Sequence, residues 1–213
     1  MQTTLKVIRL DQSAWIQMES EDKLPRLSRL TLQDLDRTMK ALKWKGCERL
    51  ILSGRFDGFT AYDFCAGADL GEVQCLEPIT ALEFSALGQR VAEQLLWPGW
   101  KTLTLLSGVV MGGGCDLALH GQERWAIESP SKPLKLQHPA ALHGLITGFG
   151  GTQRVNQLLG HVETLKFFKN LEVWNGAMCQ KAGLVSRVLV VEDIEPALRA
   201  WQSQRTQEDE SLD

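Results

Sequence analysis

The segment with the clearest potential for chemistry is Val109–His120, in which three glycines, Gly112–Gly114, separate a hydrophobic run from Cys115 and Asp116. Consecutive glycines leave main-chain N–H groups uncovered by side chains. If a helix begins directly after them, those groups lie at its positive end, where they can hold a phosphate or a carbonyl oxyanion. The spacing fits neither a P-loop nor GxGxxG, and the P-loop lysine is absent. The segment therefore favours an oxyanion hole, with Asp116 beside it as a candidate acid or base.

A second donor for such a hole normally comes from another part of the chain. Phe64–Leu70, with the sequence FCAGADL, offers one. It is a turn of small residues that follows a polar loop and leads into a possible helix. We therefore expect two separate segments of the chain to converge on one carbonyl oxygen.

Together the two segments resemble the enoyl-CoA hydratase/isomerase (crotonase) family, in which a turn FxAGADL and a segment GGGCELA supply the two halves of one oxyanion hole. Gly148–Val155, GFGGTQRV, followed by Leu158–Gly160, is similar to the family's helix start GAGGTQRL…LLG. Ala182–Val188, AGLVSRV, is similar to its A-x-GLV-x-x-V segment. The four matches fall in the family's order and approximate spacing over residues 50–192. Together they are more specific than any single glycine-rich motif.

The resemblance implies an α/β fold, a crotonase-like spiral of ββα repeats in a single core domain, that binds an acyl thioester. The backbone N–H groups of Ala68 and Gly113 would bind the thioester oxygen. The substrate is expected to be an acyl-CoA or an acyl-carrier-protein thioester, with no further cofactor and no metal. Further contacts to the substrate or to CoA are expected from Ala66, Gly67, Asp69, Gly112, Gly114, Gly148 and Gly150.

The chain departs from the family pattern at the acid and base residues. The family's hydratases use two glutamates around a water, and the first, in GGGCE, is Asp116 here. Counting back from Thr152 without a gap places Ala140 at the second, in F-G-x-P-E. A two-carboxylate mechanism thus loses one partner. His138 and His143 flank the vacated position, and each is either a replacement acid or base near neutral pH or a structural histidine.

These residues favour an enzyme that stabilises an enolate in an oxyanion hole, in the double-bond isomerisation or the decarboxylation of an acyl thioester. Isomerisation needs one proton shuttle, Asp116 or a histidine, whereas decarboxylation needs little beyond the hole. Two alternatives stay open: classical enoyl-CoA hydration, and a non-catalytic binding or assembly subunit that keeps the fold.

The elements that must position these residues follow from hydrophobic periodicity. Strands are expected at residues 5–10, 14–18, 50–53, 102–110, 125–127 and 184–191. Helices are expected at residues 32–45, 80–97 and 193–204, and a further helix is expected to begin at residue 115. Three more are expected in the segments GTQRVNQLLG, VETLKFFKN and NGAMCQKAG. Thr31 is the candidate N-cap of the first helix. Alternation of strands and helices points to an α/β domain with parallel pairing.

Composition limits the classes of protein that remain. The 213 residues are 44% hydrophobic and 23% charged. They suggest one domain, with a core at residues 1–192 and a C-terminal helix and polar tail at residues 193–213. A formal charge of -3, with no cluster of Lys and Arg residues, argues against a protein that binds nucleic acid. No apolar run reaches the roughly 18–20 residues that span a membrane. The start of the chain lacks a signal sequence, and five scattered cysteines fit reduced thiols, so a cytoplasmic protein is expected.

Two regions around the expected pocket also differ from the family. The segment SEDKLPRLSRLT replaces an R-N-A-L-like loop that embraces CoA, which makes an acyl-carrier thioester as compatible as free CoA. The sequence stops at Asp213, where family members usually continue into helices that cover the acyl pocket and build a trimer. We therefore expect uncovered apolar surface, and either a homo-oligomer, a trimer by family analogy, or a partner chain.

Overall fold

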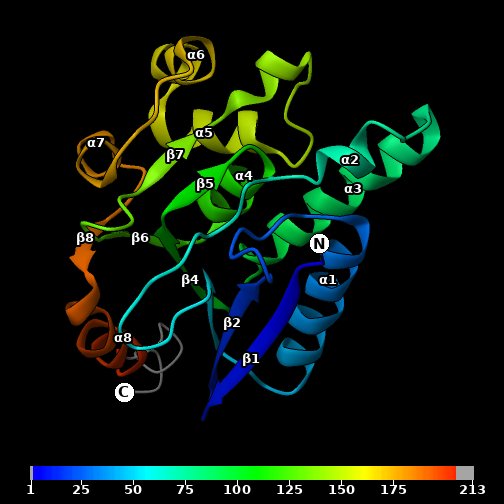
Figure 1. The fold of residues 1–213 in the computed structure, drawn as a ribbon. Helices are drawn as coiled ribbons and strands as arrows, with labels where there is room; N and C mark the ends of the chain where they lie inside the picture. The colour runs from blue at the N-terminus through cyan, green and yellow to red at the C-terminus, as the bar shows by residue number, and fades with distance from the viewer. Residues whose placement is uncertain (1, 205–213) are drawn as a thin grey trace.

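A six-stranded sheet lies at the centre of the computed structural model, which describes residues 2–204 and, of His143, the backbone only (Figure 1). The strand order is β1-β2-β3-β4-β6-β8. β1 runs antiparallel to β2, and every other neighbouring pair is parallel. The strands are β1 (Thr4–Leu10), β2 (Ser13–Glu19), β3 (Arg49–Gly54), β4 (Lys101–Ser107), β6 (Glu123–Glu128) and β8 (Arg187–Val190). The expected α/β class with parallel pairing is confirmed.

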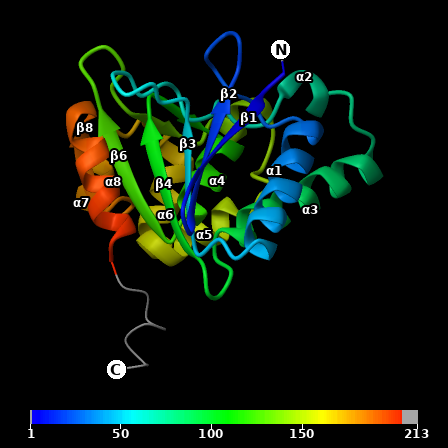
Figure 2. The same ribbon diagram turned by 90° about the horizontal axis from the view of Figure 1, so that it is seen from below.

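Side chains of the sheet alternate between two hydrophobic cores, as the two-residue period of a strand requires. In β3, Leu50 and Leu52 belong to the first core, whereas Ile51 belongs to the second. The first core is completed by the buried faces of helices α1 (Arg29–Trp44), α3 (Pro78–Gln94) and α4 (Gly113–His120), and the second by α8 (Ile194–Gln202). Figure 2 shows α1 and α8 at opposite ends of the row of strands.

The helices lie close to the ranges that the sequence predicts. They are α1 (Arg29–Trp44), α2 (Leu70–Val73), α3 (Pro78–Gln94), α4 (Gly113–His120), α5 (Gly151–Leu159), α6 (His161–Asn170), α7 (Gly176–Ala182) and α8 (Ile194–Gln202), with short 3-10 helices η1 (Pro139–His143) and η2 (Val191–Asp193). The start of α1 corrects one prediction. Ser28, not Thr31, is its N-cap, because the Ser28 side chain accepts a hydrogen bond from the Thr31 N–H at 3.1 Å.

The single strand predicted at residues 102–110 is wrong, because the chain turns sharply at Gly108 between β4 and β5 (Val109–Met111). Gly108 has a φ of +52°, and a Cβ there would overlap the Asp63 side chain, so the turn requires glycine. β5 then pairs in parallel with β7 (Lys135–Gln137) in a second, two-stranded sheet. This change of direction carries the glycine segment away from the main sheet and toward the candidate site.

The last helix is held against the main sheet. The indole Nε1 of Trp201 in α8 donates a hydrogen bond to a carboxylate oxygen of Glu123 in β6 at 2.8 Å. From residue 205 on, the predicted polar tail lies outside the described residues. Within residues 2–204, no helix combines the length and the apolar character that crossing a membrane requires.

Candidate active site

The two glycine-containing segments meet side by side, as expected. Cys65 forms a parallel bridge with Val110, in which the Cys65 N–H donates to Val109 O at 3.0 Å and the Met111 N–H donates to Cys65 O at 2.9 Å. The bridge extends the small second sheet, and it brings the turn after Cys65 against the start of α4. The turn at Gly108 between β4 and β5 therefore allows β5 to pair with the segment around Cys65.

The backbone N–H groups of Ala68 and Gly113 are brought together by this bridge. A Cβ built on Gly113 would lie 3.5 Å from the Ala68 nitrogen. Gly67, with a φ of +100°, makes the approach possible, since a Cβ there would lie 2.7 Å from the Met111 carbonyl oxygen. Within the described residues, neither the Ala68 nor the Gly113 N–H has a hydrogen-bond acceptor. The pair forms a site for an external acceptor.

Local charge at the Gly113 N–H is positive because α4 begins there. The first N–H groups of a helix have no partner within the helix, and its dipole adds partial positive charge. Gly112 precedes α4 with a φ of +52°, which glycine adopts readily. These amides can therefore stabilise an oxyanion at this position.

A cavity of about 360 Å³ opens in front of the two amides. Its walls are mainly apolar and come from α2, α3, α4 and the segment that precedes α5. The lining residues are Ala66, Ala68, Leu70, Val73, Leu76, Ala81, Phe84, Ser85, Met111, Gly112, Gly113, Asp116, His138, Pro139, Ala140, Leu145, Ile146, Thr147, Gly148 and Phe149. We call this cavity the site pocket.

Asp116 lies in the site pocket and is paired with a histidine. Its Oδ1 is 2.9 Å from Nε2 of His138, and both side chains are 1% exposed. When Asp116 is ionised, as a general base must be, its carboxylate only accepts hydrogen bonds and Nε2 of His138 donates. The hydroxyl of Thr147 donates to Oδ2. Two candidates from the sequence, Asp116 and His138, are thus joined, and Thr147 completes the arrangement.

The start of α5 packs directly against the Asp116 carboxylate and leaves no free space on that side. A Cβ on Gly151, the first residue of α5, would overlap the carboxylate. The ring of His138 packs against Phe168 with centroids 5.0 Å apart. Both groups of the pair are therefore held in place by packing as well as by hydrogen bonds.

The residue that the count back from Thr152 places at the family's second glutamate is Ala140, which carries no acid. Ala140 lies in the wall of the site pocket, next to His138 and Pro139. His143, the other histidine expected to flank this position, ends η1, and its side chain lies outside the described part of the structure. Asp116 is accordingly the carboxylate that lines the pocket among the residues described.

The remaining predicted contact residues divide into three groups. Ala66, Gly112 and Gly148 line the site pocket. Gly67 and Gly114 pack tightly, since a Cβ on Gly114 would lie 2.6 Å from the Cys65 carbonyl oxygen. Two others lie outside the site pocket: Asp69 caps α2 by accepting from the Gly71 N–H at 3.0 Å, and Gly150 lines a different cavity.

Two residues of the site were missed from the sequence. Thr147 and Phe149 belong to no acid–base or nucleophilic pattern, and no spacing rule connects either one with Asp116. Phe149 did carry a signal, because the GAGGTQRL motif has alanine where this chain has the large aromatic ring. A large side chain in a run of glycines indicates a position at which a cavity is filled.

The thiols near the site are unsuited to nucleophilic chemistry. Burial raises the pKa of Cys65 to about 12, and it raises the pKa of Cys115 well above the ordinary thiol range. Only a thiolate is a good nucleophile, so both thiols stay protonated and inert near neutral pH. Among the described residues, the amide pair and the Asp116–His138 pair stay the candidate groups for chemistry.

Comparison with known proteins agrees with this geometry. The model of the enoyl-CoA hydratase/isomerase family matches residues 14–210, nearly the whole chain. The chain belongs to the enoyl-CoA hydratase/isomerase family. The resemblance inferred from four short motifs is thereby confirmed.

Two relatives illustrate the match within the family. A crotonyl-CoA hydratase of Syntrophomonas wolfei is 32% identical over 152 residues, which cover 71% of this chain and 55% of that protein. A probable enoyl-CoA hydratase of Mycobacterium leprae is 29% identical over 140 residues, 64% of this chain and 51% of that protein. The matched region thus spans about half the length of these relatives.

Solved structures agree with the fold. An enoyl-CoA hydratase from Bacillus anthracis superposes with a TM-score of 0.80 at 23% identity, covering 92% of this chain and 74% of that one. An enoyl-CoA hydratase from Thermoplasma volcanium gives a TM-score of 0.82 at 22% identity, covering 93% and 75%. The expected crotonase-like fold is therefore confirmed.

Proposed function

We propose that the chain binds an enoyl thioester, of CoA or of an acyl carrier, with the carbonyl oxygen between the amides of Ala68 and Gly113. The observation that carries the proposal is the amide pair itself. Both N–H groups lack an acceptor within the described chain, and both line a pocket that also contains Asp116. A carbonyl oxygen is the ligand that such a pair fits.

The amide pair would act on the charge that develops during the reaction. A thioester becomes an enolate when it gains a nucleophile at the β-carbon or loses a proton from the α-carbon. The negative charge of the enolate lies on the carbonyl oxygen, next to both N–H groups. Each such donor is typically worth about 3–4 kcal/mol of transition-state stabilisation.

Hydration of the double bond is the reaction that the named relatives favour, since both carry the name of a hydratase. We propose that Asp116 accepts a proton from water while the water oxygen bonds to the β-carbon. The same proton then returns to the α-carbon of the enolate. The hydrogen bonds from His138 and Thr147 orient the carboxylate, and this route needs one carboxylate instead of two.

Double-bond isomerisation is a second candidate, and Ala140 is the observation that favours it. The described lining residues include no second carboxylate that could activate a water beside Asp116. Asp116 would take a proton from the α-carbon of a 3-enoyl thioester and return it to the γ-carbon. This reaction uses the same enolate and the same amide pair.

Product analysis distinguishes these reactions. The purified protein is incubated separately with 2-enoyl, 3-enoyl and malonyl thioesters, each on CoA and on an acyl carrier. Formation of a 3-hydroxyacyl thioester identifies hydration, conversion of the 3-enoyl into the 2-enoyl compound identifies isomerisation, and CO₂ release identifies decarboxylation. If saturated acyl thioesters bind but none of the substrates is converted, the chain is a binding subunit. If no thioester binds, the proposal is wrong.

A further inference from the structure

A second cavity, also of about 360 Å³, lies beyond the site pocket. Most of its lining residues are polar or charged, whereas those of the site pocket are mainly apolar. The lining residues are Gln89, Glu93, Leu96, His120, Phe149, Gly150, Gln153, Arg154 and Gln157. The reaction proposed above uses none of its polar side chains.

The two cavities lie one after the other along the same pair of helices. Ser85 of α3 and Asp116 of α4 line the site pocket, whereas Gln89 and His120, each four residues further on, line the second cavity. Four residues correspond to about one helical turn, or roughly 5–6 Å along the axis. The second cavity therefore lies about one helical turn beyond the site pocket along α3 and α4.

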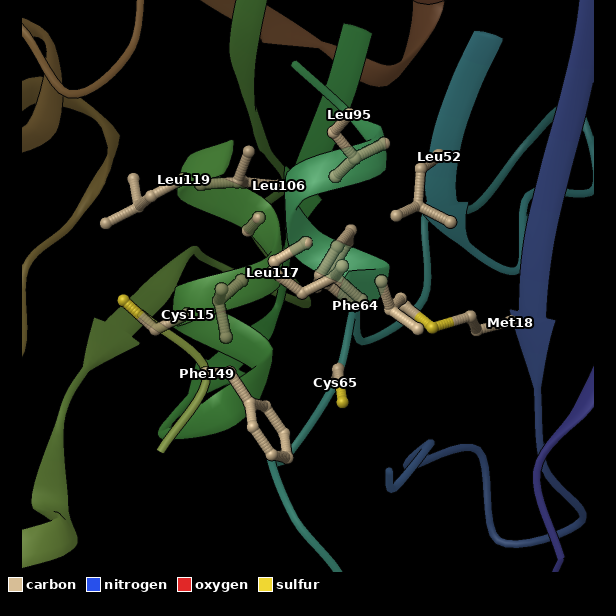
Figure 3. Close-up of a cluster of buried hydrophobic side chains, with 14 of the residues drawn as sticks. Met18, Leu52, Phe64, Cys65, Leu95, Leu106, Cys115, Leu117, Leu119 and Phe149 are labelled. Atoms are coloured by element: carbon tan, nitrogen blue, oxygen red, sulfur yellow. The ribbon is translucent and has the colours of Figure 1, made fainter. Parts of the chain in front are cut away.

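Phe149 is the residue that the two linings share among the described residues. Phe149 is 4% exposed, and its ring fills the gap between α3 and α4, with a glycine on either side. A Cβ on Gly88 of α3 would overlap one edge of the ring, and a Cβ on Gly113 of α4 would lie 2.7 Å from the other edge. Figure 3 shows the ring beside the helix that carries Cys115 and Leu117. The ring is thus a wall between the two cavities.

We propose that Phe149 determines acyl-chain length by closing the end of the site pocket, and that a smaller side chain there joins the two cavities. This inference rests on the proposed function, because it takes the ligand to be an acyl thioester. The joined space would accept a longer acyl chain by on the order of four methylene groups, the length of one helical turn. A chain with a polar group at its far end would fit best, since the glutamine, His120 and Arg154 side chains surround that end.

The test is a binding series with saturated acyl-CoA compounds of increasing length, which cannot be hydrated or isomerised. Titration calorimetry compares the wild type with Phe149→Leu and Phe149→Ala; the leucine variant is included because it keeps much of the core packing. In the wild type, affinity should rise by about fourfold per methylene and then stop rising at a limiting length. In both variants the limit should move to longer chains, with a larger movement for alanine.

A blocking variant tests the route of the added length. Gln153 is exposed on α5 and lines the second cavity, so Gln153→Trp should fill that space without touching the site pocket. In the Phe149→Leu background it should restore the wild-type limit. An unchanged limit in both Phe149 variants, or a longer limit that Gln153→Trp leaves in place, would overturn the inference. Absence of binding by every protein in the series would instead refute the proposed function, and the inference with it.

Discussion

Oδ1 of Asp116 lies 2.9 Å from Nε2 of His138, and almost no part of either side chain is exposed to solvent. A buried carboxylate is costly unless hydrogen bonds replace those it made to water. His138 and Thr147 supply those bonds, one to each carboxylate oxygen. The carboxylate therefore reaches the site pocket in one fixed orientation, and the three residues act as a unit.

Removing the charge of Asp116 should abolish most turnover. Asp116→Asn keeps the size of the side chain but cannot accept a proton, so kcat should fall by about 10²–10⁴-fold. Steady-state kinetics on the substrate identified by product analysis measures this change. Saturated acyl-CoA should still bind, because the amide pair is intact. Wild-type turnover in Asp116→Asn would exclude the residue from proton transfer.

His138 should act by positioning Asp116. His138→Gln can still donate a hydrogen bond from its amide, whereas His138→Ala cannot. We expect a loss of turnover in the alanine variant that the glutamine variant partly restores, and a changed pH profile of kcat in both. If the alanine and glutamine variants lower turnover equally and leave the pH profile of kcat unchanged, the role of His138 is structural only.

The Ala68 N–H can be removed without breaking a hydrogen bond within the described chain. In Ala68→Pro the donor is lost, and kcat/KM should fall by about 10²–10³-fold, the usual effect of deleting one oxyanion donor. Ala68→Gly is the matched control, since it changes the side chain but keeps the N–H. Thermal unfolding of both variants shows whether the fold is retained. A proline variant that folds and keeps wild-type kinetics would contradict the assignment.

Stability should fall on mild acidification because of His120. Burial lowers the pKa of this imidazole below its ordinary value of 6.5, so the folded state resists the protonated form. Below about pH 6.5 the unfolded chain binds the proton more readily, and the free energy of unfolding decreases as the pH falls. The contribution is fully present above pH 6.5. Denaturant unfolding between about pH 8 and 5 measures it, and His120→Gln should reduce the slope over that range.

Thiol labelling should report on burial. Cys75 is exposed, whereas Cys47, Cys65, Cys115 and Cys179 are buried. Burial raises the pKa of both Cys65 and Cys179 to about 12, which suppresses the reactive thiolate. An alkylating reagent at neutral pH should therefore modify Cys75 first and the other four only after denaturation. Mass spectrometry resolves the sites, and rapid labelling of Cys115 in the native protein would contradict the described packing.

Sequence reasoning succeeded where a motif carries its own geometry. The glycine segment and the FCAGADL turn were expected to meet, and Ala68 and Gly113 do lie together. Ala140, the residue that the count back from Thr152 places at the second glutamate, does lie in the pocket wall. Both predictions depend on backbone shape at glycines and on a fixed distance from a neighbouring motif, which a sequence records directly.

It failed where tertiary packing decides the outcome. The glycine in the apolar run at residues 102–110 did not predict the turn at Gly108. One long buried strand and two short strands joined by a turn have the same amino-acid composition. The Asp116–His138 hydrogen bond joins α4 to the residue between β7 and η1, and no local pattern encodes it. Phe149 acts through the space it fills between two helices, which depends on the two glycines that face it.

The two hydrophobic cores lie on opposite faces of one sheet. A substitution in the second core can therefore lower the stability of the fold without changing the rate constants of the site. Trp201 and its neighbours in α8 contact the core that contributes no residue to the site pocket. Damage there should change how many molecules are folded, not how fast each folded molecule works. An assay on crude extract would report such a variant as impaired. Activity expressed per folded molecule would report it as normal.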